Sequence, residues 1–239
     1  MIRFYLSGLI FLLFSLPVPA NMLISQAIVT FESEGTKSHD IEIYNQGEET
    51  LYLKVEAKQV LSPGTKQEIK QAYRDPQQAG LLVTPQRLIL PPKTRKKVRF
   101  VKLADSKSLQ HDAVFRVLVK PEVGELKATQ TAVKVIVAYE ILVLMQPDKP
   151  RASLQGEVEN KRLKLINTGN TNVLLQKGYQ CPPGQKRQDE INQCQELVGK
   201  RMYAGNQWQL NLPYNTPVEF EILTGLDADI IWFEPKEIK

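Results

Sequence analysis

The segment Thr131–Met145, TAVKVIVAYEILVLM, constrains the fold more than any other part of the chain. Every second residue from Val133 to Met145 is apolar, whereas both charges, Lys134 and Glu140, fall on the other parity. A two-residue period with one apolar face indicates a β-strand. Extended, the segment would span about 50 Å, more than most strands in globular proteins. It is therefore either a long central strand of a sandwich or an exposed edge that pairs with another chain.

The first twenty residues have the features of a secretory signal peptide. Arg3 supplies the positive charge, Leu6–Leu16 is an apolar core, and Val18-Pro19-Ala20 resembles a cleavage site. The apolar core is too short for a typical transmembrane helix, although an uncleaved anchor is the alternative. We therefore expect export, with cleavage after Ala20.

Composition excludes several classes of function. Removing residues 1–20 removes one arginine and no acid, which leaves 30 basic against 26 acidic residues and a net charge of +4. This mild excess does not favour nucleic acid as a partner. The sequence has no glycine-rich phosphate loop, no G-x-S-x-G motif and no metal-binding spacing. We expect no enzymatic activity, no small-molecule substrate, no cofactor and no metal.

Cys181 and Cys194 are the two cysteines of the chain. In an exported protein a closely spaced pair predicts a disulfide. A shared metal site is the alternative, but His39 and His111 lie far away in the sequence.

The remaining chain alternates between short strand patterns and turn signals. Strands are predicted over Met22–Phe31, Asp40–Tyr44, Leu51–Val60, Lys97–Leu103, Ala113–Val119 and 131–145, and then over Leu163–Ile166, Val173–Tyr179, Gln207–Leu212, Val218–Leu223 and Ile230–Phe233. The polar stretch Gln67–Gly80 is predicted to be a long surface loop. No window has a convincing helical period, so the fold is predicted to be all-β.

Two prolines, Pro147 and Pro150, separate the two sets of strands. Proline cannot donate to a β-ladder and stiffens the chain, so an interdomain boundary is expected here. The predicted organisation is a signal peptide over residues 1–20, one β-sandwich domain over 21–147 and a second over 148–239, which carries the disulfide hairpin.

Five stretches in this order resemble the periplasmic pilus-assembly chaperones of the chaperone–usher pathway: TPQRLILPPKTRKKVRF from Thr84, VFRVLVKP from Val114, VKVIVAYEILVLMQP from Val133, LKLINTGNTNV from Leu163 and RMYAGNQW from Arg201. The cysteine hairpin of the second domain resembles the branch that builds alternate pili.

The resemblance implies two immunoglobulin-like domains in a boomerang arrangement, located in the periplasm. It also implies pilin subunits and an outer-membrane usher as partners, with the long strand completing a pilin by donor-strand complementation. We expect Val133, Val135, Val137 and Tyr139 to supply this donor strand, and a free molecule could cap it in a homodimer. The alternative to this donor-strand hypothesis is that these four side chains face the protein's own core. In that case Val135→Lys would unfold the domain. A structural pilus subunit or adhesin is the alternative function.

In this family, basic side chains in the cleft between the domains hold the carboxylate of the pilin. The usual pair is missing here, because Met22–Phe31 has no cation and Lys134 lies too far from the linker. Arg99 is the first expected substitute and Arg116 the second. A salt bridge within its own domain is the alternative for Arg99. A hairpin centred near Gly124 would place Arg116 opposite Lys134, which is unfavourable for two like charges.

Overall fold

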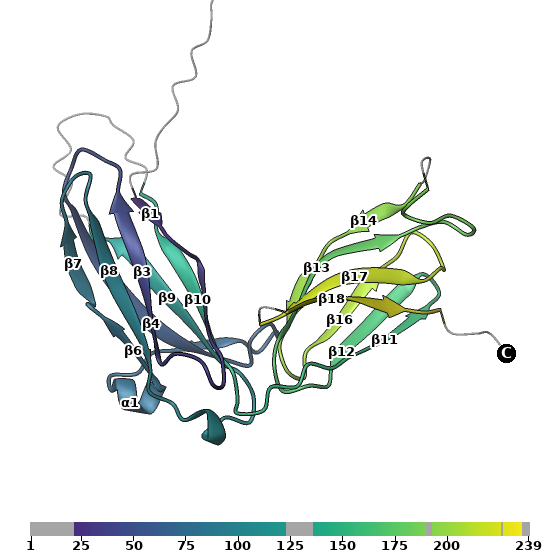
Figure 1. Cartoon of the computed structure of the whole chain (residues 1–239), viewed down its shortest axis with the longest axis horizontal. Helices are drawn as coiled ribbons and strands as arrows, with labels where there is room; N and C mark the ends of the chain where they lie inside the picture. The colour runs from purple at the N-terminus through teal and green to yellow at the C-terminus, as the bar shows by residue number, and fades with distance from the viewer. Residues whose placement is uncertain (1–21, 123–135, 190–192, 226, 236–239) are drawn as a thin grey trace, which may run out of the picture.

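The structure, a computed structural model, describes residues 22–122, 136–189, 193–225 and 227–235. Figure 1 shows two β-sandwich lobes that meet at an angle at the linker. The expectation of an all-β fold with two immunoglobulin-like sandwiches in a boomerang is confirmed. The helices of the described part are one turn of α-helix and one 3-10 turn, neither long enough to cross a membrane.

The first lobe packs two sheets around an apolar core. A four-stranded sheet has the order β1-β3-β8-β6. The opposing sheet has the order β2-β10-β9-β4, and both β5 and β7 pair with β4. The elements are β1 (Met22–Ile24), β2 (Ile28–Phe31), β3 (Ser38–Asn45), β4 (Leu51–Leu61), β5 (Ile69–Gln71), α1 (Pro76–Ala79), β6 (Leu81–Thr84), β7 (Arg87–Leu90), β8 (Arg95–Lys102), the 3-10 helix η1 (Ser106–Ser108), β9 (Ala113–Pro121) and β10 (Tyr139–Met145).

The first predicted strand is two strands in different sheets. β1 pairs antiparallel with β3, whereas β2 pairs parallel with β10. The chain crosses between the sheets over Ser25–Ala27, where polar Ser25 and Gln26 interrupt the apolar run. The prediction of one continuous strand over Met22–Phe31 was therefore wrong.

Within the described residues, the long predicted strand is the seven-residue β10. Ile141, Val143 and Met145 are fully buried in the core of the first lobe, while Leu142 and Leu144 face outward toward the second lobe. Val137 is half-buried and precedes the strand. Val133 and Val135 lie outside the described residues, so their role stays a prediction.

The predicted loop Gln67–Gly80 contains two regular elements. β5 pairs with the end of β4, and α1 follows four residues later. The carboxylate of Asp75 accepts the N–H of Gln77 at 2.9 Å, which caps the first turn of α1. Gly80 ends it with φ +78°, a left-handed conformation that favours glycine. The surface-loop prediction missed these elements because four residues are too few to show a helical period.

The second lobe has a three-stranded sheet, β11-β12-β16, and a sheet β14-β13-β17-β18 in which β15 also pairs with β13. Its strands are β11 (Leu154–Glu159), β12 (Arg162–Asn167), β13 (Val173–Gln180), β14 (Gln195–Leu197), β15 (Lys200–Met202), β16 (Gln207–Asn211), β17 (Val218–Thr224) and β18 (Asp227–Phe233). An apolar core that includes Val158, Leu175 and Phe220 lies between the sheets.

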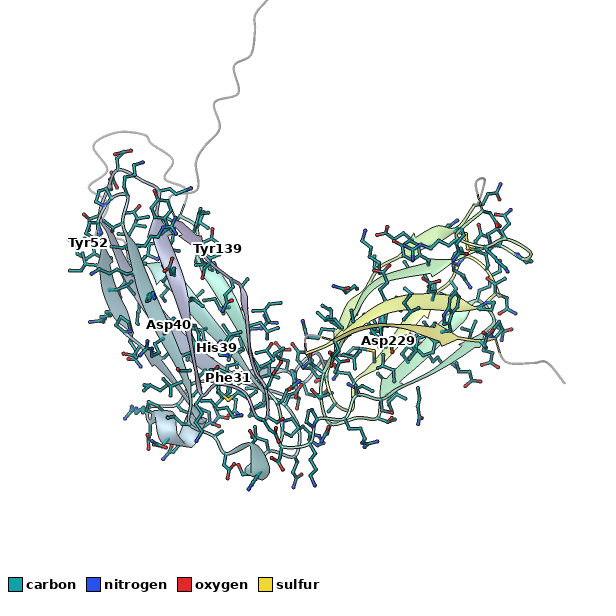
Figure 2. All side chains as sticks on the ribbon, viewed as in Figure 1. Phe31, His39, Asp40, Tyr52, Tyr139 and Asp229 are labelled. Carbon is teal, nitrogen blue, oxygen red and sulfur yellow. A yellow bond between two sulfur atoms is a disulfide. The ribbon has the colours of Figure 1, made fainter. Side chains whose placement is uncertain are left out.

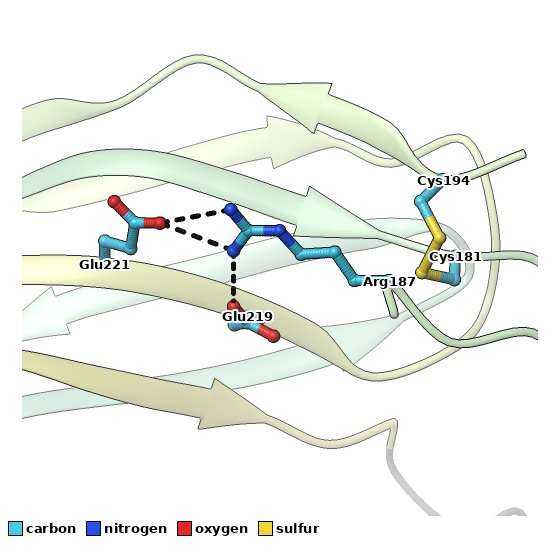
Figure 3. Close-up of polar contacts among 5 residues, drawn as sticks. All are labelled: Cys181, Arg187, Cys194, Glu219 and Glu221. Carbon is cyan, nitrogen blue, oxygen red and sulfur yellow. Dashed lines mark hydrogen bonds and ion pairs between the residues drawn. A yellow bond between two sulfur atoms is a disulfide. The ribbon is translucent and has the colours of Figure 1, made fainter. Parts of the chain in front are cut away.

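A disulfide joins Cys181 and Cys194 and closes the connection between β13 and β14, as predicted. Arg187 on this loop reaches the carboxylates of Glu219 and Glu221 on β17, at 3.0 and 3.3 Å (Figure 3). Its guanidinium also lies over the ring of Tyr179, 3.6 Å from the centroid. The side chain of Glu219 is buried, so this ion pair fastens the loop to the sheet.

Candidate functional site on the face between the lobes

The outer face of β4, β9 and β10 carries three rows of side chains because the register of the strands aligns them. Figure 1 shows β9 and β10 on the side of the first lobe that faces the second. From the linker outward, the rows are Val60–Val114–Leu144, then Lys58–Arg116–Leu142, then Glu56–Leu118–Glu140. An apolar row is thus followed by a basic row and an acidic one.

The apolar row packs against the second lobe. Val60, Val114, Leu142 and Leu144 form one buried cluster with Tyr203, which follows β15. Val60 thus lies on the parity of β4 that otherwise carries charged, outward-facing side chains, and it is buried because the second lobe covers it. This cluster joins the outer face of the first lobe to the second lobe.

Arg116 lies next to this apolar cluster, in the basic row. It pairs across the sheet with Leu142, so the expected clash with Lys134 was wrong, because the register of the hairpin differs from the one assumed. Its side chain is 31% exposed, and its Nε lies 4.0 Å from the carboxylate of Glu140. Lys70 holds the same carboxylate at 2.6 Å. Arg116 therefore keeps donors free for a further anion.

Arg201 lies behind Arg116 on the second lobe, in β15. It donates a short hydrogen bond to the side-chain oxygen of Asn172. Burial lowers the pKa of the Arg201 guanidinium and nearby Arg116 adds to this, while Tyr203 and Asp112 act in the opposite direction. An arginine stays charged under such shifts. Two cations therefore share the inner end of the cleft.

Asp112, just before β9, joins the two lobes. Its carboxylate accepts the backbone N–H and the side-chain amide of Asn172, both at 2.6 Å, and the hydroxyl of Thr171 at 2.9 Å. Burial raises the pKa of Asp112, and the hydrogen bonds from Asn172 and Thr171 partly oppose the shift. Such a buried carboxylate is tolerated because its oxygens are bonded.

A second tie lies at the tip of the β4–β5 hairpin. The side-chain amide of Asn206 donates to the carbonyl of Pro63 at 3.0 Å, and a Cβ on Gly64 would come within 2.6 Å of the oxygen of Asn206. Gly64 also has φ +72°, a backbone conformation that residues other than glycine rarely adopt. The two ties flank the apolar cluster and set the angle between the lobes.

Arg99 lies on β8, in the other sheet of the first lobe. Its guanidinium grips the carboxylate of Asp40 on β3 with two bonds of 2.7 and 2.8 Å (Figure 2 labels Asp40). The hydrogen bond from Arg99 lowers the pKa of Asp40 below its ordinary 3.8. The anchor role of Arg99 stays a prediction, but this position is on the sheet opposite the one that packs against Tyr203 of the second lobe.

The edge of β10 is covered along only part of its length. β2 pairs with Leu142–Met145, and no described strand pairs with Tyr139–Ile141 on that side. Tyr139, in the upper half of the first lobe in Figure 2, packs partly on the core and donates its hydroxyl to the carbonyl of Met22 at 2.8 Å. Within the described residues, the open edge of β10 thus runs from Ile141 to Tyr139, away from the linker.

Sequence reasoning missed Lys58, Asp112 and Tyr203 as members of this face. The resemblance included the stretch that contains Tyr203, but nothing in the local pattern around Asp112 indicates a partner on the other lobe. Within the described ranges no group of three histidine, cysteine or acidic side chains could hold a metal ion.

The fold of two sandwiches matches that of the periplasmic pilus-assembly chaperones, which confirms the resemblance seen in the sequence. The class 5 fimbriae chaperone CfaA superposes with a TM-score of 0.64 at 21% identity, over 90% of this chain and all of that one. A chain of the CsuC–CsuE chaperone–tip adhesion subunit pre-assembly complex of Acinetobacter baumannii gives a TM-score of 0.61 at 14% identity, over 91% of this chain and all of that one.

Sequence comparison finds curated relatives with fimbrial names. One CS1 fimbrial subunit of Escherichia coli is 29% identical over 192 residues, 78% of this chain and 79% of the relative. One CFA/I fimbrial subunit of Escherichia coli is 27% identical over 170 residues, 69% and 71% of the two chains. No protein-family profile matches the chain.

Proposed function

We propose that the protein is a periplasmic chaperone that binds pilin subunits by donor-strand complementation and delivers them to an outer-membrane usher. The observation that carries the proposal is the open edge of β10, which β2 leaves without a strand partner over Tyr139–Ile141. An unpaired strand edge recruits an extended partner segment through backbone hydrogen bonds. The role is one of binding, and it requires no catalytic group.

The alternation along β10 supports the way in which a pilin would bind. Ile141, Val143 and Met145 fill the protein's own core, and Val137 and Tyr139 continue the same parity toward the open end. Side chains of one parity would therefore have two roles. Near the linker they fill the chaperone's own core, and farther from the linker they would fill the groove of the pilin. In this proposal Val133 and Val135 extend the donor strand.

The cleft supports Arg116 as the first anchor for the terminal carboxylate of the pilin. It lies beside the apolar cluster, its ion pair with Glu140 is long at 4.0 Å, and Arg201 adds positive charge behind it. Exposed Lys58 is the neighbour of Arg116 across the sheet and forms no ion pair within the described ranges. By contrast, Asp40 takes up the two nitrogens, Nε and one terminal nitrogen, with which Arg99 could grip a carboxylate.

A structural fimbrial subunit is the second candidate, because the curated relatives carry subunit names. The two-lobe fold and the solved chaperone complexes favour the chaperone. The two functions predict different assemblies, since a chaperone stays in soluble complexes whereas a structural subunit is incorporated into a fibre.

The deciding experiment is co-expression of the tagged chain with the pilins of its own host, followed by purification from the periplasm and mass spectrometry. We expect a soluble one-to-one complex with a pilin, and no tagged chain in sheared surface fibres. Recovery of the chain in the fibres, or a periplasmic fraction without any bound pilin, would contradict the proposal.

A further inference from the structure

A groove opens at the edge of the first lobe opposite β10. Its volume is about 740 Å³, and it runs beside β4 between the loop Ala72–Arg74 and the start of β7. The core side chains Val55, Val83 and Phe115 form its floor. β9 separates β4 from β10, so this groove is distinct from the donor edge, and Lys58 is the one residue that it shares with the proposed anchor site.

The backbone of β4 lacks a neighbouring strand along this groove. β7 pairs with β4 up to Lys54, and the N–H of Val55 still donates to the carbonyl of Gln86 at 2.8 Å. Pairing with β5 begins at Gln59. In the described part of the chain, the edge over 56–58 therefore has no strand beside it on this side. Three residues of an extended strand span about 10 Å, so a partner segment would pair with β4 over this short stretch only.

The rim of the groove is strongly basic. Four basic side chains line it and only one acidic one, that of Glu56. The basic residues are Lys54, Lys58, Arg74 and Arg87. Lys54 and Lys120 already bind Glu56, at 2.7 and 3.5 Å. Lys58, Arg74 and Arg87 form no ion pair in the part of the chain that the structure describes. The positive charge is therefore uncompensated.

We propose that this groove binds an extended segment of a partner protein in which carboxylates alternate with apolar residues. The segment would lie along the free edge of β4. Its apolar side chains would point to the floor formed by Val55 and Phe115, and its carboxylates to Arg74 and Arg87 at the rim. Backbone pairing supplies affinity in such strand addition, and the alternating side chains supply specificity.

The test uses a fluorescent peptide of alternating valine and glutamate, about eight residues long, with the full chain in a low-salt buffer. Fluorescence anisotropy is expected to show binding that weakens as the salt concentration rises. The double variant Arg74→Glu with Arg87→Glu should weaken it by at least about tenfold. The matched control is Lys96→Glu with Lys97→Glu, the same charge change at the exposed start of β8, and it should bind as the wild type does.

Circular dichroism should show that both double variants are folded. A blocking variant, Ala72→Trp, should also weaken binding, because Ala72 is exposed and lines the groove. The proposal is overturned if the peptide does not bind, or if a valine–lysine peptide binds equally well. It is also overturned if both double variants lose binding alike, or if the groove variant binds normally, since the peptide then uses another edge such as β10. None of these outcomes depends on pilin binding.

Discussion

Asp112 of the first lobe accepts two hydrogen bonds of 2.6 Å from Asn172 of the second, one from its backbone N–H and one from its side-chain amide. Asp112→Ala would leave these largely buried donors without their acceptor. We expect the free energy of unfolding to fall by about 1–3 kcal/mol, measured by urea denaturation. We also expect the two lobes to unfold in separate calorimetric transitions.

Asp148→Ala is the control for this variant. Asp148 lies in the linker, and within the described residues its carboxylate has no hydrogen bond or ion pair. The control should therefore unfold like the wild type. Equal stabilities of Asp112→Ala and the wild type would show that the tie contributes little to the angle between the lobes.

The carboxylate anchor is tested by comparing two arginines. The sequence analysis placed Arg99 first, whereas the proposed function places Arg116 first. Arg116→Ala should weaken pilin binding by about two orders of magnitude. The terminal carboxylate of the bound pilin would then be buried without its charged partner. Arg99→Ala should bind pilin nearly as the wild type does. Surface plasmon resonance with a purified pilin would measure both, and a larger loss for Arg99→Ala would restore the original assignment.

The donor strand is tested by lysine substitution at two positions of one parity. Val137 is half-buried, whereas Ile141 is fully buried in the core. Val137→Lys should remain folded by circular dichroism but fail to retain pilin. Ile141→Lys should unfold the first lobe, because it buries an unpaired charge. If Val137→Lys unfolds as well, this parity serves the protein's own core at both positions, which is the rival considered from the sequence.

The pair Asp40–Arg99 predicts a dependence of stability on pH. Arg99 lowers the pKa of Asp40 below 3.8, so the pair stabilises the folded state above that pH and loses its effect as the pH falls below it. The melting temperature of Asp40→Asn should lie below that of the wild type at pH 7, and the difference should shrink as the pH falls below 3.8 and through the lowered pKa of Asp40. The effect is small because both side chains are solvated.

Glu42→Gln provides the comparison for Asp40→Asn. Glu42 faces Arg95 across the same two strands, but at the longer distance of 3.5 Å. At pH 7, Glu42→Gln should therefore lower the melting temperature by less than Asp40→Asn does. A difference for Asp40→Asn that grows toward acid pH would mean that the carboxylate is not stabilised by Arg99.

The disulfide should contribute about 3 kcal/mol to the stability of the second lobe, since it closes a loop with a sequence separation of 13. It also holds the loop that carries Arg187 to the buried Glu219. Replacing both cysteines by serine should lower the melting temperature, and reductant should then have no further effect. Natively purified wild-type protein should have no thiol that reacts with an alkylating agent, and two reactive thiols would contradict the bond.

Alternation predicted most of the longer strands of both sandwiches, because many of them bury one parity, but it did not predict β5, β11, β14 or β15. The disulfide was predictable too, since two close cysteines in an exported chain have few other uses. Alternation failed at Met22–Phe31, where one apolar run is divided between two sheets. A period-two pattern indicates which residues face a core, but it does not specify which neighbouring strand they pair with.

The site was less predictable than the fold for a related reason. The sequence analysis ranked Arg116 second, after Arg99, as a carboxylate anchor. The neighbours of Arg116 depend on the register of a hairpin, which a sequence does not specify. Val60 looked like the end of an ordinary strand, yet Tyr203 of the other lobe covers it. Contacts between lobes join residues that are distant in the chain, so local patterns contain no signal for them.

The parallel pairing of β2 with β10 also determines when the first lobe can fold. Ile28 pairs with Leu142, which lies 114 positions later in the chain. Contacts of such long sequence separation form late and slow folding, because a large loop must first be closed. In a protein that emerges from a membrane with its N-terminus first, nearly the whole lobe must cross before its sheet can close. The open edge of β10 can therefore form only after that step, when the first lobe itself has folded.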